Sequence, residues 1–279
     1  MKPQEGNLRK IRIAFYRMLM GVGRGFSTVK GSPFQNVYLS VFKDYKVKNY
    51  SGSKLDFFPY ATLTEDIANS DLIAKSGAEI FWKIDSSKQV NMTLNPDFGQ
   101  VESDEVVVNF SAFETFYSDK RPFFSENNNL FDVRSMMHRV INTRRIGGKP
   151  DYNCSLFGED EEYCQNNQAD SSEIDFALKY TQKGEVDFGL LTASERDQKF
   201  SKGRDYYALR LNTKQDSLRY GYLGTYVNKP VFDSNALVNS FDFEYLPSKA
   251  HRFTSNLLHS NVEETDGFGL AFGYRYDLN

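Results

Sequence analysis

The chain has 279 residues, with 34 Lys and Arg against 37 Asp and Glu, and a net charge of −3 at pH 7. This balance gives no basic field for nucleic acid, which is therefore not an expected partner. A mean hydropathy of −0.56, with no apolar run of roughly 18 residues, excludes a transmembrane helix. It does not exclude a membrane barrel, because strands that alternate between lipid and lumen average to a polar composition. The 24 Phe and 17 Tyr favour an all-β fold.

Residues 1–34 are predicted to form a poorly defined N-terminal segment, and residues 35–279 a partial β-barrel domain. The first residues are basic and include an apolar patch, but Arg17 interrupts the patch and no small-residue cleavage site follows. No signal peptide is therefore predicted. Residues 35–42 are a candidate strand, and the polar stretch after them, through Lys54, is predicted to be a loop.

A hairpin is predicted next. Residues 78–84 and 90–94 each alternate between apolar and polar side chains, and the polar turn Ser86-Ser87-Lys88 separates them. The following stretch, 95–132, carries many carboxylates, aromatic residues and turn residues. It holds more apolar surface than a free loop would, so we predict a strap packed against the inner wall of a barrel.

Another strand is predicted from His138 to Thr143. The polar, acidic residues 149–172 are predicted to form a long exposed loop. This loop holds Cys154 and Cys164, which are the only two cysteines. A disulfide in an oxidising compartment is the favoured interpretation, with two free thiols as the alternative.

Beyond residue 172 the pattern becomes regular. Seven strands are predicted, at 173–181, 185–194, 204–212, 217–227, 235–245, 251–261 and 266–276. Each is close to the roughly 9–11 residues that cross a bilayer when tilted. One face of each strand is large and apolar, and the other is small or charged. The large residues are Ile174, Phe176, Leu178 and Tyr180 in the first strand, and Phe268, Leu270, Phe272, Tyr274 and Tyr276 in the last.

Short and long connections are expected to alternate between these strands, as in outer-membrane barrels. Tyr180, Tyr226, Tyr245 and Tyr276 fall near strand ends, where either an interfacial girdle or ordinary β-propensity accounts for them. The fold class is therefore all-β, an antiparallel up-and-down meander forming part of a transmembrane β-barrel, with the strap as an insert. Because seven is odd and a closed bacterial barrel needs an even count, further strands of a longer parent protein are expected.

The carboxylates of the strap could indicate a glycosidase pair or a calcium site, but their spacing singles out neither. We favour lumen charges that pair with nearby Lys and Arg. The candidate binding residues are Asp97, Glu102, Asp104, Glu114, Lys120, Arg121, Glu126, Arg144 and Arg145. His138, His251 and His259 have no metal-ligand spacing, and no nucleophile motif is present, so we predict no catalytic residue, metal or cofactor.

The stretch NPDFGQVESDEVVVNFSAFETFYSDKRPFF, followed by RRIGG at residues 144–148, resembles the signature of bacterial domain-of-unknown-function family 5916. The resemblance is specific over about 95–148 and compatible from roughly residue 57 onward. It implies an outer-membrane β-barrel of the TonB-receptor-like kind, usually preceded by a signal peptide and a module resembling family-nine carbohydrate-binding modules. It implies a bacterial outer-membrane location and no established activity. Relative to that family, the N-terminal module and the closing strands are expected to be missing.

Two functions remain open. The first is a non-enzymatic barrel segment for passage or uptake of a small or glycan-related solute, with outer-membrane lipid as a partner. The second is a soluble β-rich protein that binds or hydrolyses carbohydrate. In the second case Trp82 or Tyr117 would be a sugar platform, and Glu102 and Glu126 would be candidate acid and base.

Overall fold

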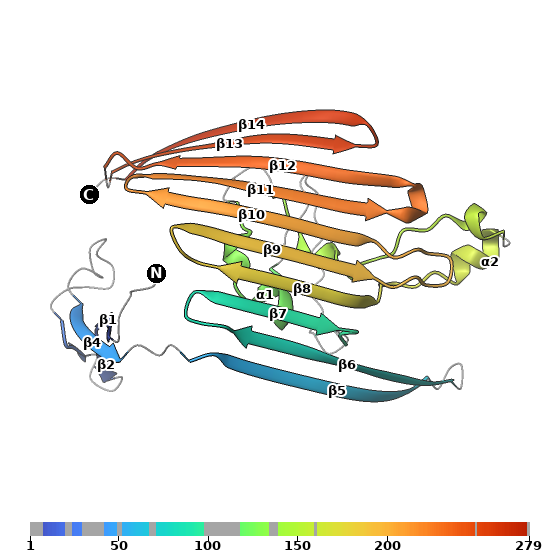
Figure 1. The fold of residues 1–279 in the computed structure, drawn as a ribbon, viewed down its shortest axis with the longest axis horizontal. Helices are drawn as coiled ribbons and strands as arrows, with labels where there is room; N and C mark the ends of the chain where they lie inside the picture. The colour runs from blue at the N-terminus through green and yellow to red at the C-terminus, as the bar shows by residue number, and fades with distance from the viewer. Residues whose placement is uncertain are drawn as a thin grey trace.

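The computed structural model describes residues 8–19, 24–29, 42–48, 52–66, 71–97, 118–133, 139–158, 161–248 and 250–277. Its main feature is one ten-stranded sheet in which neighbours in space are neighbours in sequence and every pair is antiparallel (Figure 1). The strands are β5 (Lys54–Asp66), β6 (Asp71–Lys83), β7 (Lys88–Leu94), β8 (Ile174–Gln182), β9 (Val186–Glu195), β10 (Asp205–Gln215), β11 (Leu218–Lys229), β12 (Ser234–Tyr245), β13 (His251–Val262) and β14 (Thr265–Tyr276). The fold is therefore all-β, as predicted.

The seven C-terminal strands are confirmed as β8 to β14, and the predicted hairpin is β6 and β7. The sequence did not predict β5, whose apolar pattern is broken by Pro59. Proline cannot donate to a strand ladder and is tolerated at a sheet edge, where β5 lies. The strand predicted at 35–42 falls almost entirely outside the described residues.

Two small sheets precede the large one. β1 (Leu8–Ile13) pairs with β4 (Lys43–Lys48), and β2 (Tyr16–Leu19) pairs with β3 (Arg24–Ser27). Residues 43–48, predicted to be a loop, are thus a strand that pairs along its length with β1, and Lys10 and Arg12 of β1 form ion pairs with Asp44 of β4. The large sheet begins at Lys54 rather than at residue 35, and the small sheets lie beside it in Figure 1.

The large sheet has two chemically different faces. The outer face carries large apolar side chains that are exposed along their strands; Phe268 of β14 is 79% exposed. Other exposed members are Leu55, Leu63, Leu72, Leu190, Leu209, Leu211, Phe241, Phe243, Leu257, Leu270 and Phe272. The inner face carries mostly small, polar or charged side chains, among them Asn91, Thr93, Ala177, Lys179, Ala193, Ala208, Arg210, Ser240 and Asn256, all buried. Leu191 and Leu223 are buried apolar members of the same face. Alternation along each strand produces this division, because successive side chains point to opposite faces.

One residue departs from the predicted faces. Ile174 was assigned to the large apolar face of its strand, but it is buried in the core. The β8–β9 register shifts between Ile174 and Phe176, which is a β-bulge. A bulge inserts one extra residue and so turns the preceding side chain to the other face.

The core lies between the inner face and residues 118–133, which we call the anchored segment. This segment contains α1 (Pro122–Ser125) and η2 (Asn128–Leu130). Its Phe123, Phe124, Leu130 and Phe131 pack with Ala177, Leu191, Ala193, Ala208 and Leu223 of the sheet. The sequence predicted such packing for a strap at 95–132, of which residues 98–117 lie outside the described residues.

The remaining connections contain further short helices: η3 (Thr143–Arg145), η4 (Cys154–Phe157), α2 (Glu161–Asn166) and η5 (Pro230–Phe232). The strand predicted at 138–143 is wrong for its described residues, because Val140 and Ile141 pack against the core without joining the ladder. The predicted loop at 149–172 is partly helical. None of the helices in the described residues is long and apolar enough to cross a membrane.

The connections define two rims of the sheet. The turn rim joins β6 to β7, β8 to β9, β10 to β11 and β12 to β13, and the loop rim carries the other connections (Figure 1). The predicted alternation of short and long connections holds only in part. Residues 196–204 form a long loop on the loop rim, but 230–233 and 263–264 on the same rim are no longer than the turn at 246–250.

β5 and β14 are the two edges of the sheet and lie on opposite sides of it in Figure 1. They do not pair with each other in the part of the chain that the structure describes. Their outward backbone N–H and C=O groups are therefore available to further strands.

Replacing Gly189 with Ala should destabilise the packing of the anchored segment. A Cβ at Gly189 would lie 2.8 Å from Cζ of Phe131 and 2.9 Å from Cδ2 of Leu130, both in the core. We expect the free energy of unfolding to fall by about 1–3 kcal/mol, measured by denaturant titration. Gly184→Ala is the matched control, because the nearest atom to its added Cβ is 3.6 Å away. Equal effects at the two glycines would contradict the packing described here.

Candidate functional site

A buried lysine attaches the anchored segment to the sheet. Lys179 of β8 is 2% exposed, and its ammonium donates to the backbone carbonyls of Phe123, Phe124 and Glu126. These carbonyls lie in and just after the single turn of α1, where they lack helical partners. Lys179, on the inner face of the sheet, thus supplies the hydrogen bonds that the carbonyls at the end of α1 lack.

A buried arginine makes the second attachment. Arg210 of β10 is 4% exposed, donates from Nε to the carbonyl of Leu130 at 3.2 Å, and forms a two-pronged ion pair with Asp242 of β12. Gly221 of β11 makes this possible, since a Cβ there would lie 2.7 Å from both terminal guanidinium nitrogens. One guanidinium therefore ties two strands to the anchored segment.

The two motifs that carried the family resemblance meet in space. Arg121 donates to the carbonyl of Ile146 and to that of Thr143, both at 2.7 Å, and its guanidinium also binds the carboxylate of Asp119. Thr143 donates its hydroxyl to the same carboxylate at 2.9 Å. The guanidinium also lies over the ring of Phe124. The SDKRPFF sequence therefore forms one lock with RRIGG and the threonine just before it, and we define the lock as Asp119, Arg121, Thr143 and Ile146.

The charge state of the lock follows from its surroundings. Burial of Asp119 would raise the pKa of its carboxyl, but the hydrogen bonds and positive charge of Arg121 outweigh burial and hold that pKa below its ordinary value. Asp119 is therefore ionised at neutral pH. The ion pair it forms has side-chain exposures of only 11% and 2%, so it is shielded from solvent.

The glycines of RRIGG connect the lock to the sheet. Gly147 has φ of +77°, a conformation that favours glycine, and its N–H donates to the buried carboxylate of Glu195 at 2.8 Å. Glu195 also accepts from Arg204 at 2.7 Å and from the Tyr206 hydroxyl at 3.2 Å. The loop rim is thus joined to β9 and β10 around one carboxylate.

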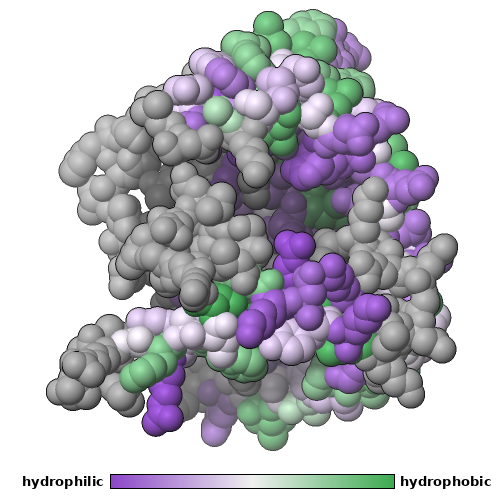
Figure 2. Space-filling view, turned by 90° about the vertical axis from the view of Figure 1, so that its left-hand side faces the viewer, coloured by the Kyte–Doolittle hydropathy of each residue, from purple (hydrophilic) through white to green (hydrophobic). Residues whose placement is uncertain are grey.

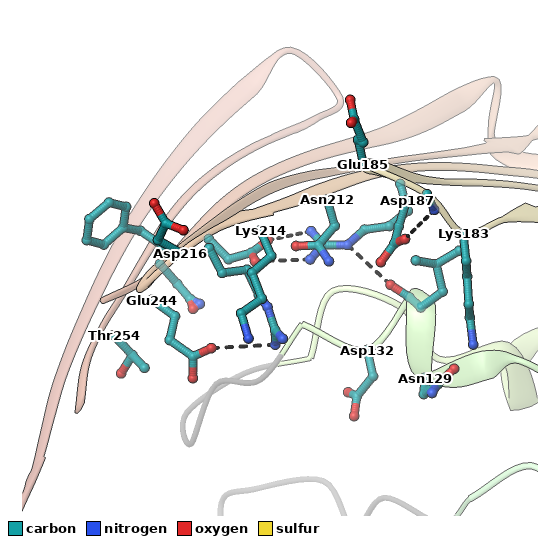
Figure 3. Close-up of a pocket in the computed structure, with 17 residues that line it drawn as sticks. Asn129, Asp132, Lys183, Glu185, Asp187, Asn212, Lys214, Asp216, Glu244 and Thr254 are labelled. Carbon is teal, nitrogen blue, oxygen red and sulfur yellow. Dashed lines mark hydrogen bonds and ion pairs between the residues drawn. The ribbon is translucent and has the colours of Figure 1, made fainter. Parts of the chain in front are cut away.

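A pocket of about 730 Å³ opens between the anchored segment and the sheet near the turn rim (Figure 3). It is lined mainly by charged and amide side chains, including Asn129 and Asp132 of the anchored segment and Asp187, Asn212 and Lys214 of the sheet. Figure 2, which shows the turn rim face-on, has hydrophilic side chains around a hollow and hydrophobic ones toward the outer margin. We call this cavity the rim pocket.

The predicted binding residues fall into three groups. Glu102, Asp104 and Glu114 lie outside the described residues. Arg121 belongs to the lock, and Glu126 accepts from Asn91 at 3.1 Å and lies 3.8 Å from Lys83. The other four are Asp97, Lys120, Arg144 and Arg145; Lys120 and Arg145 are exposed, while Asp97 and Arg144 are half-buried. None of these residues lines the rim pocket.

Cys154 and Cys164 are joined in a disulfide that ties η4 to α2, with a Cα–Cα distance of 5.8 Å. Among the described residues, no group of three or more His, Cys, Asp or Glu side chains is arranged to hold a metal ion. His138 lies outside those residues. His251 and His259 lie near opposite ends of β13 on the outer face and bond to Tyr274 and Asp266 of β14, respectively.

Sequence reasoning did not single out the residues that attach the anchored segment, Lys179 and Arg210, or the carboxylates Asp119 and Glu195. A signal was present for Lys179. It is a charged residue on the small face of an otherwise apolar strand, and such a charge needs a partner inside the protein.

A family model described as Domain of unknown function (DUF5916) matches residues 52–193, just over half of the chain. The chain therefore belongs to this family, as the resemblance at 95–148 predicted. The matched range includes the whole anchored segment and the lock. No curated protein and no solved structure matches the chain.

Arg121→Lys should release the lock although it preserves the charge. Lysine lacks the planar fork that reaches Asp119 and two carbonyls at once, so those carbonyls lose their donor. We expect a loss of about 2–4 kcal/mol in the free energy of unfolding. We also expect faster proteolytic cleavage within residues 118–133. Lys120→Arg, an exposed neighbour, serves as the control. Protection equal to that of the wild type in Arg121→Lys would rule the lock out as the restraint.

Proposed function

We propose that this member of the DUF5916 family forms part of a bacterial outer-membrane β-barrel through which a polar solute passes. The observation that carries the proposal is the division of the ten-stranded sheet into two faces. Large apolar side chains are exposed on the outer face, whereas charged and polar side chains line the inner one. In water such an outer face is a liability, but acyl chains would cover it.

The aromatic residues of the outer face support the proposal. Toward the turn rim, Tyr245, Phe253 and Tyr274 stack on one another across β12 to β14. Toward the loop rim, Tyr207 and Tyr226 lie 6.1 Å apart between ring centres. Leucine and phenylalanine side chains lie between the two groups. Two aromatic girdles that flank an apolar band are typical of outer-membrane barrels.

A spanning sheet cannot leave its edges open to lipid, because each unpaired backbone group there costs several kcal/mol. We therefore propose that β5 and β14 pair with further strands of a longer parent protein. The anchored segment would then lie inside the lumen and narrow it. An N-terminal carbohydrate-binding-like module, as the family resemblance implies, would make a glycan-related solute one candidate cargo.

The alternative, a soluble carbohydrate-binding or hydrolysing protein, has less support. Trp82 is 42% exposed on the outer face and donates to Ser53. Glu126 lies on the opposite face, beside Asn91 and Lys83. A platform and a carboxylate separated by a sheet cannot act on the same sugar. Tyr117 and Glu102 lie outside the described residues.

Leu209→Arg should impair membrane insertion. Leu209 lies on the outer face of β10 between the two aromatic girdles, where an arginine would cost about 2–4 kcal/mol near the bilayer midplane. Gln215→Arg, on the same face at the turn-rim end of β10, should cost only about 0–1 kcal/mol. The measurement is the fraction of protein folded in lipid vesicles over a urea series. If the two variants insert equally well, or if the wild type is soluble without detergent, the outer face does not contact lipid.

Passage is tested by conductance in planar bilayers, with the protein expressed from its complete gene. We expect discrete ion conductance that increases when residues 121–132 are deleted, because the anchored segment would no longer narrow the lumen. Deleting residues 154–164, the disulfide loop on the loop rim, is the control and should leave the conductance nearly unchanged. If neither the wild type nor the 121–132 deletion variant conducts ions, the proposal that a solute passes through the barrel is wrong.

A further inference from the structure

We infer that the rim pocket binds zwitterionic solutes of the amino-acid or short-peptide class; this names a substrate class for the proposed passage and rests on it. Its volume of about 730 Å³ falls within the roughly 300–1,000 Å³ of small-ligand sites. The lining offers fixed charges of both signs. Some of these charges are paired within the described part of the protein, and others are not.

Part of the charge is committed to the fold. Arg210 pairs with Asp242 and holds the anchored segment. Glu244 lies 3.5 Å from Arg219 and 3.4 Å from Arg252. These groups are held by protein partners and are poor candidates for contacts with a solute.

Other charges in the rim pocket have no ion-pair partner among the described residues. They are the ammonium groups of Lys183 and Lys214 and the carboxylates of Asp132, Glu185, Asp187 and Asp216. Glu185 points away from the anchored segment in Figure 3. In Figure 3, Lys214 and Asp187 point from the sheet toward the anchored segment, with Lys183 beside them. Asp187 accepts one backbone hydrogen bond, from Gly184, and that bond leaves its second oxygen open.

The register of the sheet places opposite charges close together. Asp187 of β9 pairs with Asn212 of β10, and Lys214 lies two residues further along the same face. Such diagonal neighbours have Cβ atoms roughly 7–8 Å apart. The ammonium of Lys214 and the carboxylate of Asp187 project from this same face, so each can bind the opposite end of one zwitterion.

Two further polar atoms of the lining lack partners within the described part of the chain. The side-chain oxygen of Asn212 and Nε of Arg219 are buried and make no hydrogen bond. One is an acceptor and the other a donor. Buried polar groups are nearly always satisfied by protein, water or ligand. Polar atoms of a solute or of water in the rim pocket would satisfy both groups.

The same lining disfavours a neutral sugar. Binding sites for flat apolar sugar faces use aromatic side chains, and the one aromatic residue that the described part of the chain gives the lining, Phe243, lies between the inward Asp242 and Glu244 and so on the outer face. A neutral sugar would displace water from the charged side chains but offer them only hydroxyl groups, so these charges would be left without an opposite charge. A ligand with two formal charges compensates them.

Isothermal titration of the detergent-solubilised protein with triglycine tests the inference. Triglycine should bind, and N-acetylated, C-amidated triglycine and maltotriose should not. Asp187→Asn, which retains the acceptor for Gly184, and Lys214→Gln should each weaken triglycine binding at least about tenfold. Asp233→Asn, an exposed residue of the loop rim, is the matched control and should leave binding unchanged.

Conductance measured on the same preparation separates this inference from the proposed function. A protein that conducts but does not bind triglycine at about 10 mM, or that binds the blocked peptide equally well, overturns the zwitterion assignment and leaves passage intact. Tighter binding of maltotriose overturns it in favour of a glycan. If the protein binds triglycine but does not conduct, the zwitterion site is supported and the proposed passage function is overturned.

Discussion

The ammonium of Lys179 donates hydrogen bonds to three backbone carbonyls of the anchored segment. The anchored segment contains only single helical turns, which are too short to satisfy their own ends. Buried polar backbone requires partners, so the segment can lie against the inner face only because β8 and β10 supply cations there. The same segment buries Phe123 and Phe131 in the core, and Asn129 and Leu130 of η2 line one side of the rim pocket.

This dependence explains why small residues and cations occur together on the inner face. Gly189 gives space to Phe131 and Leu130, and Gly221 gives space to the guanidinium of Arg210. Each glycine removes a side chain where a bulky or charged partner approaches the backbone closely. On the outer face Gly224 likewise gives space to the ring of Tyr222, but the partner there comes from the same strand. The difference in side-chain size between the two faces therefore reflects what each face contacts.

Much of the sheet could be predicted from sequence because alternation with a period of two is a local property. The strands β8 to β14 follow it with few interruptions. β5 was missed because Pro59 follows two adjacent phenylalanines and breaks the alternation. Ile174 was assigned to the wrong face because the prediction assumed strict alternation, which a bulge interrupts.

The site was harder to predict because its contacts are not local. Arg121 bonds to carbonyls of Thr143 and Ile146, and carbonyl groups exist at every residue, so no residue type marks them. Lys179 likewise bonds only to backbone. The sequence could indicate that charges on the small face need partners, but not which segment would provide them.

The long excursion between β7 and β8 has a consequence for the order of assembly. Every other pair of neighbouring strands is joined by at most nine residues, whereas residues 95–173 separate β7 from β8. Closing a loop of that length costs more chain entropy than forming a hairpin. The sheet therefore consists of two blocks, β5–β7 and β8–β14, whose strands are joined by short connections. We expect the β7–β8 ladder between the blocks to form last. Lys179 of β8 and Asn91 of β7 both bond to Glu126. The anchored segment therefore bridges the two strands whose pairing forms late.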